Sequence, residues 1–167
     1  SIRETAQDAF GARAVVYALL LNRDGQTQER QLESLATHAD PAVFDVTQKI
    51  SSAIHDLGAT LRLPLVDLCL PALRTLSPGQ HESFRANVRN LVDADANIDL
   101  FEYCMQSILL RHLDPEFGKV TPAVVRYKRF EDVSRAAVSL LSSLAYFGHD
   151  DLAAAERAFA SGGSALP

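Results

Sequence analysis

The sequence predicts an all-α protein, a compact bundle of about seven to eight helices. Apolar residues recur at helical spacing along most of the chain, whereas the alternation typical of strands is scarce. Aromatic residues make up only 7% of the chain and Trp is absent, which favours helices filled with Ala, Leu and Val over an aromatic-rich sandwich. At 167 residues the chain is long enough to bury a core of its own.

Three helices are expected in the first part of the chain. The first has an apolar stripe formed by Ala12, Val15, Val16, Leu19 and Leu20. A turn at Arg23–Gly25 separates it from a second helix, so the two form a helical hairpin. The third helix begins at Asp40, a capping residue followed by Pro41 at the first helical position, and it ends before Gly58.

Five further helices complete the predicted order. Residues 61–76 are apolar nearly all round, so we expect this element at the centre of the bundle, interrupted at Pro71. Ser77–Gln80 fits a capping box that starts the next helix. A helix follows the acidic turn near residue 95 and closes at Asp114–Pro115, and two more helices fill about 121–160.

We therefore expect a single helical domain over residues 1–160, with a core at about 8–117, C-terminal helices at about 121–160 and a flexible tail at 161–167. Because the only methionine is Met105, we expect the chain to be part of a longer protein. No apolar run reaches the roughly 18 to 20 residues of a membrane span, so the sequence predicts a soluble piece without direct membrane insertion. The net charge of −5 excludes nucleic acid as the expected partner. Cys69 and Cys104 lie in apolar helical patterns, which indicates free buried thiols.

The acidic turn in residues 91–102 has two interpretations. Asp95, Asp99 and Glu102 are hard oxygen ligands in one short segment and predict a weak Ca²⁺ or Mg²⁺ site. Alternatively, Asp99 caps the following helix and Glu102 offsets the helix dipole in its first turn, so that no metal is bound. An EF-hand is excluded because Ile98 occupies the position that needs Gly.

A faint internal repeat contains the acidic turn. The segment from Leu20 to Gln31 can be laid over the segment from Val92 to Glu102. The overlay matches Asp24 with Asp95, Gln28 with Asp99 and Gln31 with Glu102. Both copies read as helix, turn, helix, and only the second keeps all the carboxylates. This pattern predicts a pseudo-twofold design in which the first copy has changed to amides.

Catalytic motifs are absent from the sequence. There is no His-Glu-x-x-His, no Cys-x-x-Cys, and neither cysteine has a neighbouring base or a Gly-rich elbow. The five histidines never fall at a spacing of four, which a zinc-binding helix needs. His112, on the stripe of the helix after the acidic turn, is expected to be an interior or boundary side chain. No enzymatic activity and no catalytic residue are therefore predicted for this chain.

Several segments together resemble the C-terminal soluble region of bacterial membrane zinc metallopeptidases of the HtpX and CAAX-prenyl-protease-like family. The likeness covers about residues 8–117 and rests on Ala12–Leu21, His38–Pro41, Arg62–Asp67, Pro71–Arg74, Phe84–Val88 and Asp99–Tyr103. The acidic turn also resembles the repeated turn of TerB-like tellurite-resistance helical domains, with Asp95, Asp99 and Glu102 at the matching positions.

The resemblance implies a non-catalytic accessory domain that regulates the peptidase or binds other proteins. Its partner would be the membrane peptidase domain of the same polypeptide, and its place the cytoplasmic face of the bacterial inner membrane. Zinc would be bound only by the peptidase domain, whose His-Glu-x-x-His helix this chain lacks. The TerB-like resemblance implies an alternative, a stress-response module that binds a divalent metal.

Overall fold

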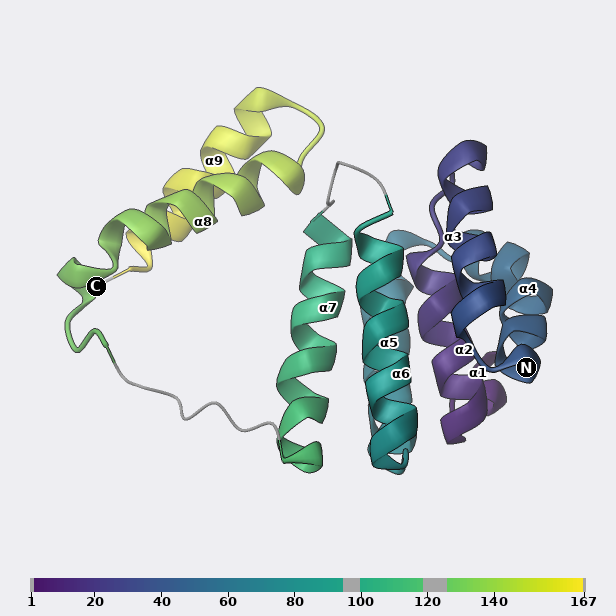
Figure 1. Cartoon of the computed structure of the whole chain (residues 1–167). Helices are drawn as coiled ribbons and strands as arrows, with labels where there is room; N and C mark the ends of the chain where they lie inside the picture. Colours follow the sequence, from purple (N-terminus) through teal and green to yellow (C-terminus); the bar gives the residue numbers. More distant parts are fainter. Residues whose placement is uncertain (1, 95–99, 119–125, 167) are drawn as a thin grey trace. The chain divides into compact units, whose positions relative to one another are not determined.

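The chain is entirely helical or irregular over the residues that the computed structural model describes, which are 2–94, 100–118 and 126–166 (Figure 1). These residues form nine α helices, two short 3-10 helices and no strand, which confirms the all-α prediction. None of the helices in these ranges has both the length and the apolar character needed to span a bilayer.

The chain divides into two compact units, residues 1–120 and residues 121–167. The first contains α1 (Ile2–Thr5), α2 (Ala9–Leu20), α3 (Gly25–His38), α4 (Pro41–His55), α5 (Ala59–Leu73), α6 (Pro78–Val92), α7 (Leu100–Leu113) and the 3-10 turn η1 (Asp114–Phe117). The second contains the 3-10 turn η2 (Phe130–Asp132), α8 (Ser134–Phe147) and α9 (Leu152–Ser164). The grouping of both units into one domain over 1–160 stays a prediction. Helix α9 continues into the segment 161–167 that the sequence predicts to be a tail.

Helix α2 is the centre of the first unit. Its residues 11–20 are all buried, and it packs against α4, α5 and α6. Small side chains make this possible because they let neighbouring helices approach closely. A Cβ on Gly11 would collide with the backbone carbonyl of Thr5, so glycine is required where α1 meets α2. The predicted stripe of Ala12, Val15, Val16, Leu19 and Leu20 is thus confirmed as core.

Helix α5 differs from its prediction. The sequence places residues 61–76 at the centre, but Leu61 is 55% exposed and Leu63 is 39% exposed, and only one side of α5 enters the core. The helix also continues through Pro64 and Pro71, so the predicted interruption at Pro71 does not occur. Both prolines are exposed, so the carbonyls that lose a donor lie where water can replace it.

Helix starts follow the predicted chemistry. The Asp40 side chain accepts a hydrogen bond from the Ala42 backbone N–H at 2.9 Å, with Pro41 at the first helical position. Ser77 and Gln80 form the predicted capping box: Gln80 N–H donates to Ser77 Oγ at 3.3 Å, and Ser77 N–H donates to Gln80 Oε1 at 2.9 Å. Local sequence therefore sets where these helices begin.

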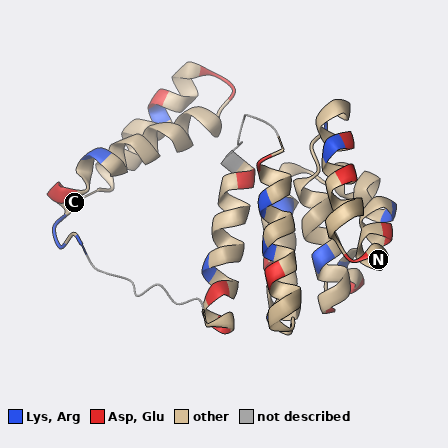
Figure 2. Cartoon of the chain, viewed as in Figure 1, with Lys and Arg blue, Asp and Glu red and all other residues tan. Residues whose placement is uncertain are grey.

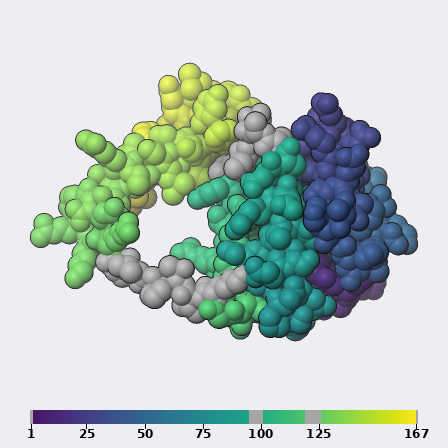
Figure 3. All heavy atoms as spheres, in the orientation of Figure 1, coloured from purple at the N-terminus to yellow at the C-terminus, as the bar shows by residue number. Residues whose placement is uncertain are grey.

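One buried amide ties the first helical hairpin to α6. Gln31, 1% exposed, donates from Nε2 to the carbonyl of Leu20 at 3.0 Å and to the carbonyl of Leu91 at 2.8 Å. Its Oε1 accepts from the Asn22 backbone N–H at 2.7 Å. The residues joined are the ends of α2 and α6, and Figure 3 shows α3 and α6 side by side on the face it presents. A helix end that is buried needs such partners.

The second unit is a hairpin of α8 and α9. Only Ala145 and Ala155 are buried among its described residues. The two helices approach closely near the end of α9, where a Cβ on Gly162 would lie 2.7 Å from Cδ1 of Leu141. Larger apolar side chains of α8 remain on its outer surface.

Candidate functional site

Of the three predicted metal ligands, Glu102 is the one that lies within the described residues. Asp95 and Asp99, including the proposed capping role of Asp99, lie outside the described residues. Glu102 lies in the first turn of α7 and is 8% exposed. Within the described ranges, no group of three or more His, Cys, Asp or Glu side chains could hold a metal ion. Whether the acidic turn binds a cation therefore stays a prediction.

Glu102 is part of the wall of a polar pocket of about 170 Å³. The pocket lies at the end of α2 and includes the turn before α3, the end of α4, the start of α5 and the start of α7. Its polar and aromatic side chains are Asn22, Arg23, His55, Arg62, Phe101 and Glu102. The turn of the first predicted copy and the start of α7 in the second both border this cavity.

Arg62 is the least compensated cation of the pocket. Its guanidinium carbon lies 5.5 Å from the centroid of the Phe101 ring, a cation–π contact. Its Nε atom is buried and donates no hydrogen bond, and no ion pair of Arg62 occurs among the described residues. A half-buried guanidinium without a carboxylate partner is unusual, because charged side chains leave water at a cost unless they are paired.

Arg23 and the His55 ring both make hydrogen-bond contacts to backbone carbonyls near the C-terminal end of α4. Arg23 Nη2 donates to the His55 backbone carbonyl at 2.6 Å. The His55 ring places Nε2 at 3.2 Å from the Leu21 carbonyl. A carbonyl can only accept, so this contact is a hydrogen bond when Nε2 carries the proton. His55, Arg23 and Arg62 come from separate stretches of the chain without a shared motif, so the sequence did not predict them as site residues.

A second charged cluster has a structural role. Asp114 lies 3.4 Å from Arg85 Nη2 and 3.6 Å from Nε2 of His81, whose ring stacks on Phe117 at 3.9 Å. These contacts fasten η1 to α6. His81 is the buried histidine, whereas His112 is exposed, so the predicted interior position of His112 is wrong. The inward row of α7 consists of Met105, Leu109 and Leu113, and His112 falls beside it.

The two cysteines are free, as predicted, but their surroundings differ. Cys69 is fully buried, and burial raises the pKa of its thiol from 9.0 to about 12. Cys104 is only half-buried, which departs from the prediction of two buried thiols. At neutral pH Cys69 is therefore a protonated and inert core residue.

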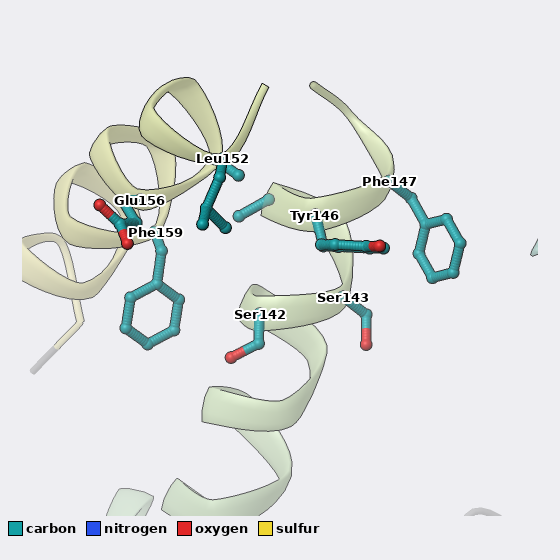
Figure 4. A pocket seen from close by; sticks show the side chains of 9 residues that line it. Ser142, Ser143, Tyr146, Phe147, Leu152, Glu156 and Phe159 are labelled. Carbon is teal, nitrogen blue, oxygen red and sulfur yellow. The ribbon is translucent and has the colours of Figure 1, made fainter. Parts of the chain in front are cut away.

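A groove of about 440 Å³ runs between α8 and α9 in the second unit. Figure 4 shows Leu152, Glu156 and Phe159 on the α9 side and Ser142, Ser143, Tyr146 and Phe147 on the α8 side. Tyr146 is 66% exposed and Phe147 70% exposed, and their rings meet edge to face at 5.5 Å. Most of the α8 and α9 ribbon carries no charge (Figure 2).

Comparison of the chain with protein-family models, with curated proteins and with solved structures gives no match.

Proposed function

We propose that this chain is a non-catalytic regulatory domain that binds other proteins and belongs to a membrane zinc metallopeptidase, on the cytoplasmic face of the bacterial inner membrane. The groove between α8 and α9 is the observation that supports an interaction role. The segments that resemble the peptidase family's C-terminal region support the peptidase portion of the same polypeptide as the partner.

The groove favours an amphipathic helix as its occupant. Phe147, Leu152 and Phe159 offer apolar contacts, and large exposed apolar surfaces on one element are typical of interaction sites. Glu156 is the one charged residue among the described residues of the groove wall. A helix with apolar residues on one face and a Lys or Arg placed to meet Glu156 would match both features.

Binding to the peptidase portion tests this proposal. The full chain, mixed with the peptidase portion in detergent, should bind it, and Phe147→Ser with Leu152→Ser should weaken binding at least about tenfold because these side chains would be buried at the contact. Tyr127→Ser is the matched control, since Tyr127 is 58% exposed in the same unit and lies outside the groove. Its binding should be unchanged.

Proteolysis by the intact enzyme gives the second readout. Deleting the domain, or introducing the groove substitutions, should change the rate of substrate cleavage if the domain regulates the peptidase. Absence of binding together with unchanged cleavage would refute the proposal. Equal loss from the groove variant and from Tyr127→Ser would assign the effect to general surface change and not to the groove.

A TerB-like metal-binding module is the alternative proposal, with Asp95, Asp99 and Glu102 as ligands of Ca²⁺ or Mg²⁺. The buried carboxylate of Glu102 beside a polar pocket is the observation that favours it. Calorimetric titration with each ion should give heat that Asp95→Asn and Asp99→Asn abolish. A titration without heat, and without any rise in melting temperature, would eliminate this alternative.

A further inference from the structure

We propose that the polar pocket beside Glu102 is a binding site for a small oxyanion, a carboxylate or phosphate group, held chiefly by Arg62. The pocket is distinct from the α8–α9 groove and does not depend on the function proposed above. Its lining residues all belong to the first unit.

Charge is the first argument. Among the described lining residues, Arg23 and Arg62 stand against one carboxylate, that of Glu102, so this part of the wall carries a net positive charge. Glu102 makes an interaction of its own, and no ion pair of Arg23 or Arg62 occurs among the described residues. An anion would supply the missing counter-charge.

Arg62 and Arg23 are each held in place by a neighbouring group. The Phe101 ring lies against the Arg62 guanidinium at 5.5 Å, and the Arg23 side chain is held by the His55 carbonyl at 2.6 Å. Both cations are thus restrained by contacts that use only part of their donors. A guanidinium has five N–H donors in a planar fork that matches carboxylate and phosphate oxygens. Little side-chain freedom remains to be lost on binding.

The volume of the pocket suits a small ligand. At roughly 30 Å³ of liquid volume per water, a pocket of about 170 Å³ holds on the order of six waters. Sites for drug-sized molecules are larger, at about 300–1,000 Å³. The pocket therefore suits an oxyanion or a small molecule that carries one, and it is too small for a nucleotide.

Titration of the isotope-labelled full chain tests the proposal by NMR of the arginine side chains. Acetate and inorganic phosphate are added separately, with chloride adjusting the ionic strength. We expect a saturable shift of the Arg62 guanidinium signals with at least one of them. A response to acetate alone identifies a carboxylate site, a response to phosphate alone a phosphate site, and a response to both a general oxyanion site; each supports the proposal.

Variants then assign the response. Arg62→Gln should weaken binding at least about tenfold, because it removes charge-assisted hydrogen bonds. Arg74→Gln is the matched control: Arg74 lies on the same chain segment at the end of α5, outside the pocket, and meets only the exposed Glu116 at 3.9 Å. Its affinity should be unchanged.

Two results would overturn the oxyanion site. The first is the absence of a saturable shift in the unmodified chain, which needs no variant and so cannot be confused with misfolding. The second is equal weakening by Arg62→Gln and Arg74→Gln, which indicates diffuse surface charge. Should Arg62→Gln lose its cooperative melting transition, Arg62→Lys replaces it, with weaker binding expected because the planar fork is lost.

Discussion

Gln31 and Glu102 are paired by the predicted internal repeat, yet the structure gives them different surroundings. Gln31 is buried, and its side-chain amide joins the ends of α2 and α6 by donating hydrogen bonds to two backbone carbonyls. The Leu91 carbonyl belongs to the residue just before the second predicted copy, which begins at Val92. Glu102 borders a cavity with two arginines. An amide can donate twice and a carboxylate cannot, so the amide suits the first position and the acid only the second.

The largest expected effect at neutral pH comes from Gln31→Glu. It places a carboxylate against the Leu20 and Leu91 carbonyls, where no cation compensates it among the described residues, so we expect a loss of at least about 3 kcal/mol in the free energy of unfolding at neutral pH. Burial raises the pKa of a carboxyl, so part of the loss should return as the pH falls and the group protonates. Chemical denaturation at several pH values measures this.

Gln28→Glu is the control for that experiment. Gln28 is half-buried in the first turn of α3, where a negative charge meets the positive end of the helix dipole. Its stability should change by no more than about 0.5 kcal/mol. If both variants lose the same stability, the proposed role of the Gln31 amide in joining α2 and α6 is wrong. The loss would then reflect a general intolerance of added negative charge in this segment.

The second expected effect contrasts the core with the edge through the two thiols. Cys69 belongs to the core that contains α2, whereas Cys104 lies half-buried on α7 of the second copy. Burial raises the pKa of Cys69 from 9.0 to about 12, so stability is full below about pH 9 and is lost as the pH rises towards 12. Three pKa units correspond to roughly 4 kcal/mol.

Cys69→Ala isolates this contribution. Burial also raises the pKa of Tyr17, from 10.0 to about 12, so the variant should begin to lose stability only near pH 10, while the unmodified chain declines from pH 9. Cys104→Ala should leave the alkaline profile as it is. Identical profiles for all three proteins would mean that neither thiol differs between core and edge.

The smallest effect is expected from Glu102→Gln. If Glu102 lines a pocket and does not join two helix ends as Gln31 does, removing its charge should lower the free energy of unfolding by about 1 kcal/mol or less. The same change should strengthen oxyanion binding severalfold, because it removes the carboxylate that the described part of the pocket wall contains. Destabilisation as large as that of Gln31→Glu would mean that Glu102 contributes as much to stability as Gln31 does, and the contrast between the two residues would be wrong.

Local chemistry was predictable from the sequence, and tertiary placement was not. The stripe of α2 and the capping box at Ser77 need only neighbouring residues, and both were predicted correctly. The apolar surface of α5 predicted a central helix, but only the fold decides that Leu61 and Leu63 face outward and that α2 is surrounded instead. Composition measures how apolar a helix is, not how many neighbours it has.

The same limit applies to the candidate site. Glu102 was singled out because its acidic neighbours are adjacent in sequence. Arg23, His55 and Arg62 carry no such signal, since they converge on the pocket from three separate stretches of chain. Gln31 was recognised as the counterpart of Glu102, but its bond to the Leu91 carbonyl joins residues far apart in sequence. Such pairings become visible only when the helices are packed.

The prolines of α5 give the two edges of that helix different dynamics. Pro64 and Pro71 supply no amide proton to the carbonyls four residues before them, so two backbone hydrogen bonds are missing on the exposed side of α5. The inner edge, with Val66, Cys69 and Leu73, is locked in the core. Outer-edge amides should therefore exchange with deuterium through brief local fraying, while inner-edge amides wait for opening of the whole bundle.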